Sequence, residues 1–242
     1  MSVLALVRHG KASAFSRTDY DQLSEPGFEQ ARLLGAYWAE RGLTADRVYV
    51  GPRRRHVETH ATVVGVLREA GIAWPDAVPL AELDEHDGLN VVFRLLPEAA
   101  RDDALLRPIA EAMARGETPT HDDALLAFRR VMRRWVRGEI AGGEHHEGIE
   151  KWATFRARVA HGLAAMTKDV GRGKTIVAFT SAGAACAAVG QVLGVTDEKV
   201  LDLSWAMHNG AFHELAVSDG GWGLRAFNAT PHLSDERLIT AV

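Results

Sequence analysis

Three consecutive residues near the start of the chain, Arg8, His9 and Gly10, have properties suited to phosphate chemistry. They follow the apolar run 3–7, which predicts a short strand buried on both faces. Ligands of open α/β sheets bind at the carboxyl ends of the strands. Arginine can clamp an anion with two hydrogen bonds, histidine can act as a nucleophile near neutral pH, and glycine lets the backbone approach a ligand. The tripeptide alone is also compatible with a surface arginine and a capping histidine at a strand end.

Later motifs favour the first interpretation. Residues 23–31 read Leu-Ser-Glu-Pro-Gly-Phe-Glu-Gln-Ala, and an expected strand over 48–50 leads into Pro52, Arg55 and Thr59. These segments resemble the histidine phosphatase superfamily, which includes the cofactor-dependent phosphoglycerate mutases. Members carry Arg-His-Gly after the first strand, then Leu-Thr-x-x-Gly-x-x-Gln-Ala, then Ser-Pro-x-x-Arg-Ala-x-x-Thr-Ala. Several spaced motifs in the right order are more specific than one.

The chain also departs from this pattern. Gly51, His56 and His60 stand where the third family motif has Ser, Ala and Ala. Near the end of the chain, Asn209 and the pair His232-Leu233 are again similar to the family. The resemblance therefore covers both ends of the chain and leaves a less familiar middle.

The alternation of expected strands and helices predicts a three-layer α/β/α fold of the phosphoglycerate mutase type, with a mostly parallel central sheet. Apolar periodicity and turn residues predict strands over 3–7, 48–50, 76–80 and 176–179, a hairpin over 212–217 and 222–227, and helices over 28–41, 59–70, 152–166 and 184–193. Residues 90–138 are strongly helical and contain several prolines. We therefore expect a single domain, residues 1–242, with a helical insertion at about 90–150 over the site.

The resemblance implies a role for each residue of the site. His9 is the expected nucleophile, and it forms a phosphohistidine. Arg8, Gly10 and Arg55 are expected to bind the phosphoryl group. The two arginines should also disfavour the imidazolium form of His9 and so keep it nucleophilic.

Two glutamates are candidates for the general acid, which the family carries in a Leu-x-Glu loop before a glycine. Residues 80–88 contain both Glu82 and Glu85. Glu85 is preferred because Leu-x-Glu at 83–85 lies closer to Gly88, and Glu82 stays open as the alternative.

The clearest departure follows the strand at 176–179, where the family reads Val-x-Ser-His-Gly-Gly. Ser181 stands where the family has a second phosphate-pocket histidine. A hydroxyl donates one hydrogen bond but carries no charge, so the loss should cost on the order of a few kcal/mol in catalysis. His208, just before Asn209, is a candidate replacement in the phosphate pocket, and a loop histidine without a role there is the alternative.

These observations predict a phosphomonoester hydrolase that acts through a phosphohistidine on a small phosphorylated metabolite. A phosphoglycerate mutase-type phosphoryl transfer and a non-catalytic phospholigand-binding protein on the same fold are the alternatives. Ser181 argues against the mutase, because mutases of the family keep the second histidine. A serine hydrolase using Ser181, Asp202 and His208 is a weaker rival, since the first glycine of Gly-x-Ser-x-Gly is missing.

Composition limits the partners. The 242 residues are 47% hydrophobic and 25% charged with a net charge of −4, which is typical of a globular protein and gives no electrostatic case for nucleic acid or an anionic membrane. The single cysteine excludes an intramolecular disulfide, and no signal peptide or membrane span is expected, so we expect a cytoplasmic protein. We expect no cofactor and no metal, with histidines 145 and 146 in a solvated loop. A homodimer is allowed by the sequence.

Overall fold

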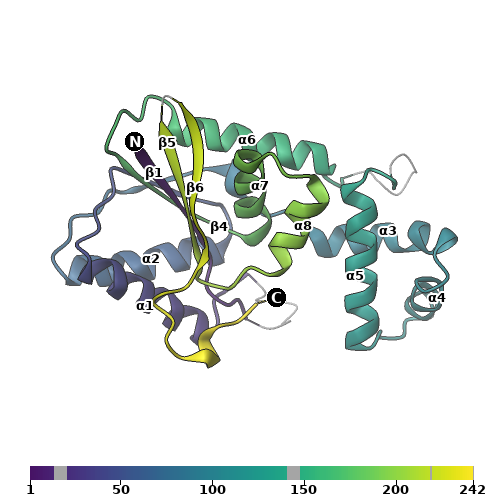
Figure 1. Cartoon of the computed structure of the whole chain (residues 1–242). Helices are drawn as coiled ribbons and strands as arrows, with labels where there is room; N and C mark the ends of the chain where they lie inside the picture. Colours follow the sequence, from purple (N-terminus) through teal and green to yellow (C-terminus); the bar gives the residue numbers. More distant parts are fainter. Residues whose placement is uncertain (14–20, 141–147, 219, 242) are drawn as a thin grey trace. The chain divides into compact units, whose positions relative to one another are not determined.

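The computed structural model describes residues 1–13, 21–140, 148–218 and 220–241 (Figure 1). The chain forms two compact units. The first contains residues 1–85 and 158–242, and the second contains residues 86–157. Each unit is described by itself.

The first unit is built on a six-stranded sheet in the order β3-β2-β4-β1-β5-β6. Its strands are β1 (Ser2–Arg8), β2 (Arg47–Val50), β3 (Ala77–Pro79), β4 (Thr175–Thr180), β5 (Phe212–Ser218) and β6 (Gly221–Ala229). The first four strands in this order run parallel, while β5 pairs antiparallel with β1 and β6 antiparallel with β5. The predicted fold class, a mostly parallel sheet with a C-terminal hairpin, is confirmed.

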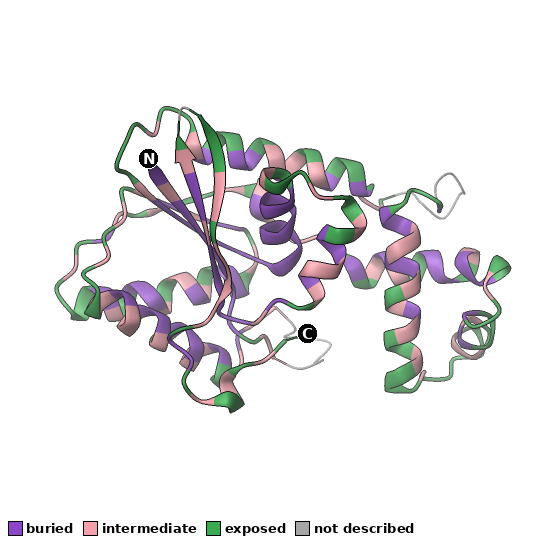
Figure 2. Ribbon diagram, viewed as in Figure 1, coloured by how far each residue is buried: buried purple, intermediate pink, exposed green. Residues whose placement is uncertain are grey.

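Helices cover both faces of this sheet (Figure 1). One face packs against α1 (Glu25–Glu40) and α2 (Arg54–Glu69), through a core that includes Val7, Val50 and Phe179 from the strands and Leu34, Trp38 and Val63 from the helices. The other face packs against α7 (Ala182–Leu193), which contacts β1, β5 and β6 and is followed by α8 (Asp197–Trp205). Residues 182–190 of α7 are all buried and mostly alanine or glycine, so this helix approaches the sheet closely (Figure 2).

The second unit is helical. It consists of α3 (Gly88–Asp102), α4 (Arg107–Ala114), α5 (His121–Val136) and the first residues of α6 (Trp152–Thr167). Asp87 and Thr120 cap α3 and α5 by accepting hydrogen bonds from the third backbone N–H of each helix. His86 lies among the rings of Trp135, Trp152 and Phe155. Helices were expected here, and their placement over the site stays a prediction.

Helix α1 begins at Glu25 rather than Phe28 and α7 at Ala182 rather than Ala184, and two further helices differ more. Helix α2 begins at Arg54 rather than near Thr59, so Arg55 belongs to its first turn. The sequence reasoning also missed α8, whose N-cap Thr196 accepts a hydrogen bond from the N–H of Lys199. No helix within the described ranges is both long and apolar enough to cross a bilayer.

The start of α1 packs directly against the loop that follows β1. A Cβ atom added at Gly27 would lie 2.1 Å from the carbonyl oxygen of Lys11, and one added at Gly10 would lie 2.3 Å from the carbonyl oxygen of Gly27. Two glycines therefore allow the backbone after His9 to lie against the first turn of α1.

This contact predicts that Gly27→Ala destabilises the protein, although alanine has a higher helix propensity than glycine. We expect the free energy of unfolding to fall by about 1–3 kcal/mol, because the added methyl group meets backbone that cannot move aside. Gly65→Ala in α2 is the matched control, since nothing lies within 4 Å of a Cβ at that helical position. The control should raise stability by up to about 1 kcal/mol in urea unfolding, and a stabilising Gly27→Ala would contradict the packing described.

Candidate active site

His9 directly follows β1 and is fixed by its own backbone. Its N–H donates to the carbonyl oxygen of Thr180 (2.9 Å), and its carbonyl oxygen accepts from the N–H of Gly210 (3.1 Å). The ring Nδ1 lies 2.7 Å from the carbonyl oxygen of Gly10. Because a carbonyl oxygen only accepts hydrogen bonds, Nδ1 carries the proton, and Nε2 of the neutral ring keeps its lone pair.

The surroundings of His9 favour this neutral form. Burial lowers the pKa of His9 well below the ordinary 6.5, and the positive charges of Arg55 and Arg8 and the neighbouring His56 lower it further. The hydrogen bond to the Gly10 carbonyl opposes this shift of the pKa. The direction agrees with the effect expected of the two arginines, and burial is the larger cause.

Arg55 reaches the site from the first turn of α2. Its buried guanidinium donates from Nη1 to Oδ1 of Asp21 (2.7 Å) and from Nη2 to Oγ of Ser181 (3.4 Å). Asp21 also accepts a hydrogen bond from the backbone N–H of Arg54 (2.8 Å), so it caps α2 from a distant part of the chain. Thr59, one turn further on, donates to the Arg55 carbonyl and accepts from the N–H of Gly10. The Thr59 side chain therefore links helix α2 to the loop after His9 by hydrogen bonds.

Arg8, the last residue of β1, is buried, and its Nη1 donates to the carbonyl oxygen of Met207. With the Asn209 amide oriented so that both of its ends are satisfied, the amide oxygen accepts from Nη2 of Arg8 (3.2 Å). The segment before β5 therefore orients the second guanidinium of the site.

The structure gives Gly10 a role beyond the one expected. The close approach that its missing side chain allows is to Gly27 of α1. Binding of a ligand by the Gly10 backbone stays a prediction.

The two candidate acids lie in different surroundings. Oε2 of Glu85 accepts a hydrogen bond from the N–H of Gly183 (3.0 Å), in the first turn of α7 and two residues from Ser181. The Glu82 side chain packs against α6, where a Cβ on Gly162 would lie 2.7 Å from its own Cβ and His161 Nε2 lies 3.8 Å from its Oε1. Glu85 is thus the carboxylate beside Ser181.

Ser181 and His208, the other expected pocket residues, differ in their contacts. The Ser181 hydroxyl meets Arg55 and, at 2.6 Å, Nε2 of His56. His208 donates its backbone N–H to Asn228, and its ring Nδ1 is buried without a hydrogen-bond partner among the described residues. The structure brings Ser181 to Arg55, while a role for His208 in the pocket stays a prediction.

Sequence reasoning missed two residues of this cluster, His56 and Asp21. The signal for His56 was available, because it was one of the departures from the family motif and it is next to Arg55. Asp21 carried no motif, and only the fold brings it to the first turn of α2.

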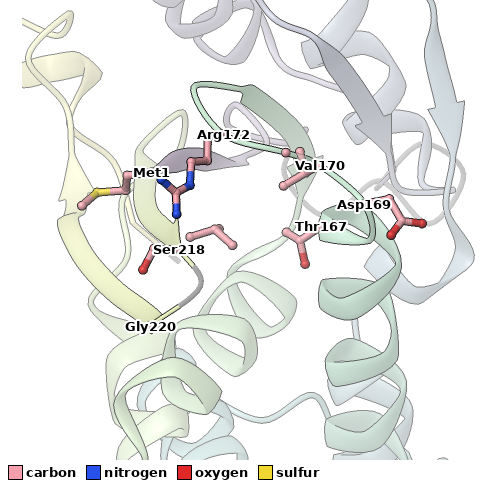
Figure 3. Close-up of a pocket in the computed structure, with 9 residues that line it drawn as sticks. Met1, Thr167, Asp169, Val170, Arg172, Ser218 and Gly220 are labelled. Atoms are coloured by element: carbon pink, nitrogen blue, oxygen red, sulfur yellow. The ribbon is translucent and has the colours of Figure 1, made fainter.

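A separate pocket of about 460 Å³ lies at the opposite, amino-terminal edge of β1, lined by Met1, Arg172 and Ser218 among others (Figure 3). It is distinct from the His9 cluster at the carboxyl end of the strand. No group of three metal-ligating side chains occurs within the described ranges. Histidines 145 and 146 lie outside them.

Comparison with known families identifies the class of protein. The family model of the histidine phosphatase superfamily (branch 1) matches residues 4–88 and 109–230, and the chain belongs to this superfamily. The residues between the two matched segments, 89–108, include most of α3.

Solved structures share the fold at low identity. Bacillus stearothermophilus YhfR is 17% identical with a TM-score of 0.65, over 97% of this chain and 100% of that chain. A mutant phosphoserine phosphatase from Entamoeba histolytica, in complex with phosphoserine, is 16% identical with a TM-score of 0.60, over 96% and 100%. The alpha-ribazole phosphatase from Shigella flexneri is 18% identical with a TM-score of 0.60, over 94% and 96%. A comparison with curated proteins gave no match.

The electrostatics of the site predict the titration of His9. Arg55→Gln should raise the pKa of His9, because it removes the charge that lowers this pKa most. Histidine ¹⁵N–¹H NMR would measure the shift, with Arg47→Gln as the control, since the Arg47 guanidinium binds the carbonyl oxygens of Lys168 and Asp169. A wild-type His9 that titrates at the ordinary 6.5 would contradict the account.

Proposed function

We propose that the protein hydrolyses phosphomonoesters of small metabolites through a phosphohistidine intermediate on His9. One observation carries the proposal: the Nδ1 proton of the His9 imidazole is bound to the Gly10 carbonyl, and burial together with two arginines lowers the pKa of the ring. An unprotonated Nε2 near two guanidinium groups is what an attack on a phosphate dianion requires.

In the first half-reaction, Nε2 of His9 attacks phosphorus and a P–N bond forms. The bond from phosphorus to the ester oxygen breaks, and its electron pair stays on the leaving oxygen. Glu85, protonated at the start of this step, gives its proton to that oxygen. Arg8 and Arg55 stabilise the charge on the non-bridging oxygens.

In the second half-reaction, water attacks the phosphohistidine. The Glu85 carboxylate, ionised by the first step, accepts a proton from the water while the P–N bond breaks. Inorganic phosphate leaves, and neutral His9 and protonated Glu85 are restored. The same side chain therefore acts first as an acid and then as a base.

The names of two relatives support the proposed substrate class. Two proteins of the same fold are described as a phosphoserine phosphatase and an alpha-ribazole phosphatase, and both names denote a small phosphomonoester as substrate. At 16–18% identity, these names support a small phosphomonoester as the class of substrate, and they do not single out phosphoserine or alpha-ribazole phosphate.

The function predicts that His9→Ala abolishes hydrolysis of p-nitrophenyl phosphate, with a loss of about a thousandfold or more, because the group that carries the intermediate is removed. His121→Ala, an exposed histidine at the start of α5, is the matched control and should keep wild-type turnover. Vanadate should inhibit the wild type, and p-nitrophenyl acetate should not be hydrolysed. A His9→Ala variant as active as the control would refute the proposal.

A separate prediction concerns the acid. Glu85→Gln should slow hydrolysis of an alkyl phosphate far more than that of p-nitrophenyl phosphate, because p-nitrophenolate leaves without protonation. Glu82→Gln, three residues earlier and packed on α6, should leave both rates near wild type. Equal losses on both substrates in Glu85→Gln would exclude Glu85 as the acid, and a leaving-group dependence in Glu82→Gln would transfer the role to Glu82.

A further inference from the structure

His56 and Ser181 form a buried contact inside the site. Nε2 of His56 lies 2.6 Å from Oγ of Ser181, and neither residue has any exposed surface. The same Oγ accepts a hydrogen bond from Nη2 of Arg55 at 3.4 Å. The first turn of α2 thus supplies two partners to one hydroxyl group.

Ser181 is free to make these contacts because it does not cap its own helix. It occupies the N-cap position of α7, where a serine side chain usually accepts a hydrogen bond from the first turn, but its hydroxyl makes no such bond. The Gly183 N–H, in the first turn of α7, donates its hydrogen bond to the Glu85 carboxylate instead.

The imidazole of His56 fits only because position 51 is a glycine. A Cβ atom there would lie 2.4 Å from Nδ1 of His56 and 3.0 Å from its Cε1. The ring occupies this space beside His9, with the two ring centroids 5.8 Å apart.

The three positions of this arrangement, Gly51, His56 and Ser181, are all departures from the family motifs identified in the sequence. A histidine is missing at 181, one is gained at 56, and the side chain at 51 that would collide with it is absent. Changes that are far apart in the sequence therefore meet at one contact.

We propose that His56 is a positioning residue that acts through Ser181: its Nε2 accepts the Ser181 hydroxyl proton, so that the lone pairs of that oxygen face Arg55 and hold its guanidinium for the phosphoryl group bound at His9. The inference rests on the proposed function for the identity of that group. A serine oxygen has two lone pairs and one proton. When Nε2 of His56 accepts the hydroxyl proton, a lone pair is left to accept from Nη2 of Arg55, and this fixes the direction of that guanidinium.

The charge state of His56 is compatible with this arrangement. Burial and the positive charges of Arg55 and Arg53 lower the pKa of His56 well below its ordinary value, and the Gly51 backbone opposes this. The Gly51 backbone raises this pKa as a hydrogen-bond acceptor, which places the one proton of the neutral ring on Nδ1 and leaves Nε2 to accept from the Ser181 hydroxyl. His9 on β1 and Ser181 on α7 face the ring from the other elements, and neither adds a negative charge.

A double-mutant cycle tests the inference, with His56→Leu, Ser181→Ala and the double variant. His56→Leu should lower kcat/KM for p-nitrophenyl phosphate and weaken vanadate binding by about tenfold each, the usual scale of one hydrogen bond. In the Ser181→Ala background the same change should have almost no effect, because the hydroxyl it orients is absent. His56→Gln, whose amide oxygen can reach the position of Nε2 and accept the same proton, should retain most of the activity.

The control is His60→Leu, one turn further along α2, whose ring packs edge-on against Phe179. It should leave vanadate affinity unchanged in both backgrounds, even if its thermal stability changes. Equal effects of His56→Leu in the two backgrounds, or no effect in either, would overturn the inference, as would a wild type that does not bind vanadate. If the double-mutant cycle shows coupling in vanadate affinity but the wild type hydrolyses no substrate, the inference stands and the proposed hydrolysis is rejected.

Discussion

Two guanidinium groups are buried beside an imidazole at the end of β1, and this arrangement is the constraint on which the rest of the site depends. Burying like charges close together is costly unless hydrogen bonds and opposite charges compensate. Asp21 compensates Arg55, and the Met207 carbonyl compensates Arg8. Burial and the positive charges of the two arginines keep His9 neutral. Under the proposed function, the same charges bind the phosphoryl group that His9 attacks.

The fold supports this arrangement by using side chains from outside each helix as caps. Asp21 caps α2 while it holds Arg55, and Glu85 caps α7 while it stands beside Ser181. Each carboxylate thus links a helix terminus to the site. A change in either one should disturb both the helix end and the chemistry.

Local sequence was enough to predict the parts of the fold that rest on local physics. The apolar run before Arg8 predicted a central strand, and the turn residues between 217 and 222 predicted the hairpin, because burial on both faces and tight turns leave a direct mark on the residues present. The start of α2 was misjudged because its cap, Asp21, lies more than thirty residues away from Arg54. Helix α8 was missed for another reason: its N-cap, Thr196, is local, but its nine residues carry only a short amphipathic pattern.

The candidate site shows the same limit. Arg8, His9 and Arg55 could be identified from their motifs, and the structure brings both arginines close enough to shift the pKa of His9. The role of His208 in the pocket stays a prediction. The contact of His56 with Ser181 could not be predicted, because positions 125 residues apart leave no pattern in a single sequence. Only the geometry shows that Gly51, His56 and Ser181 meet at one contact.

The central claim is that the phosphoryl group passes through His9, and trapping the intermediate tests it most directly. The protein would be mixed with p-nitrophenyl phosphate labelled with ³²P, quenched within milliseconds and digested, and the labelled peptide would be sequenced. The account predicts a label on His9 that is lost in acid and survives alkali, as a phosphoramidate does. A label on Ser181 that survives acid would contradict it, and so would turnover without any labelled protein.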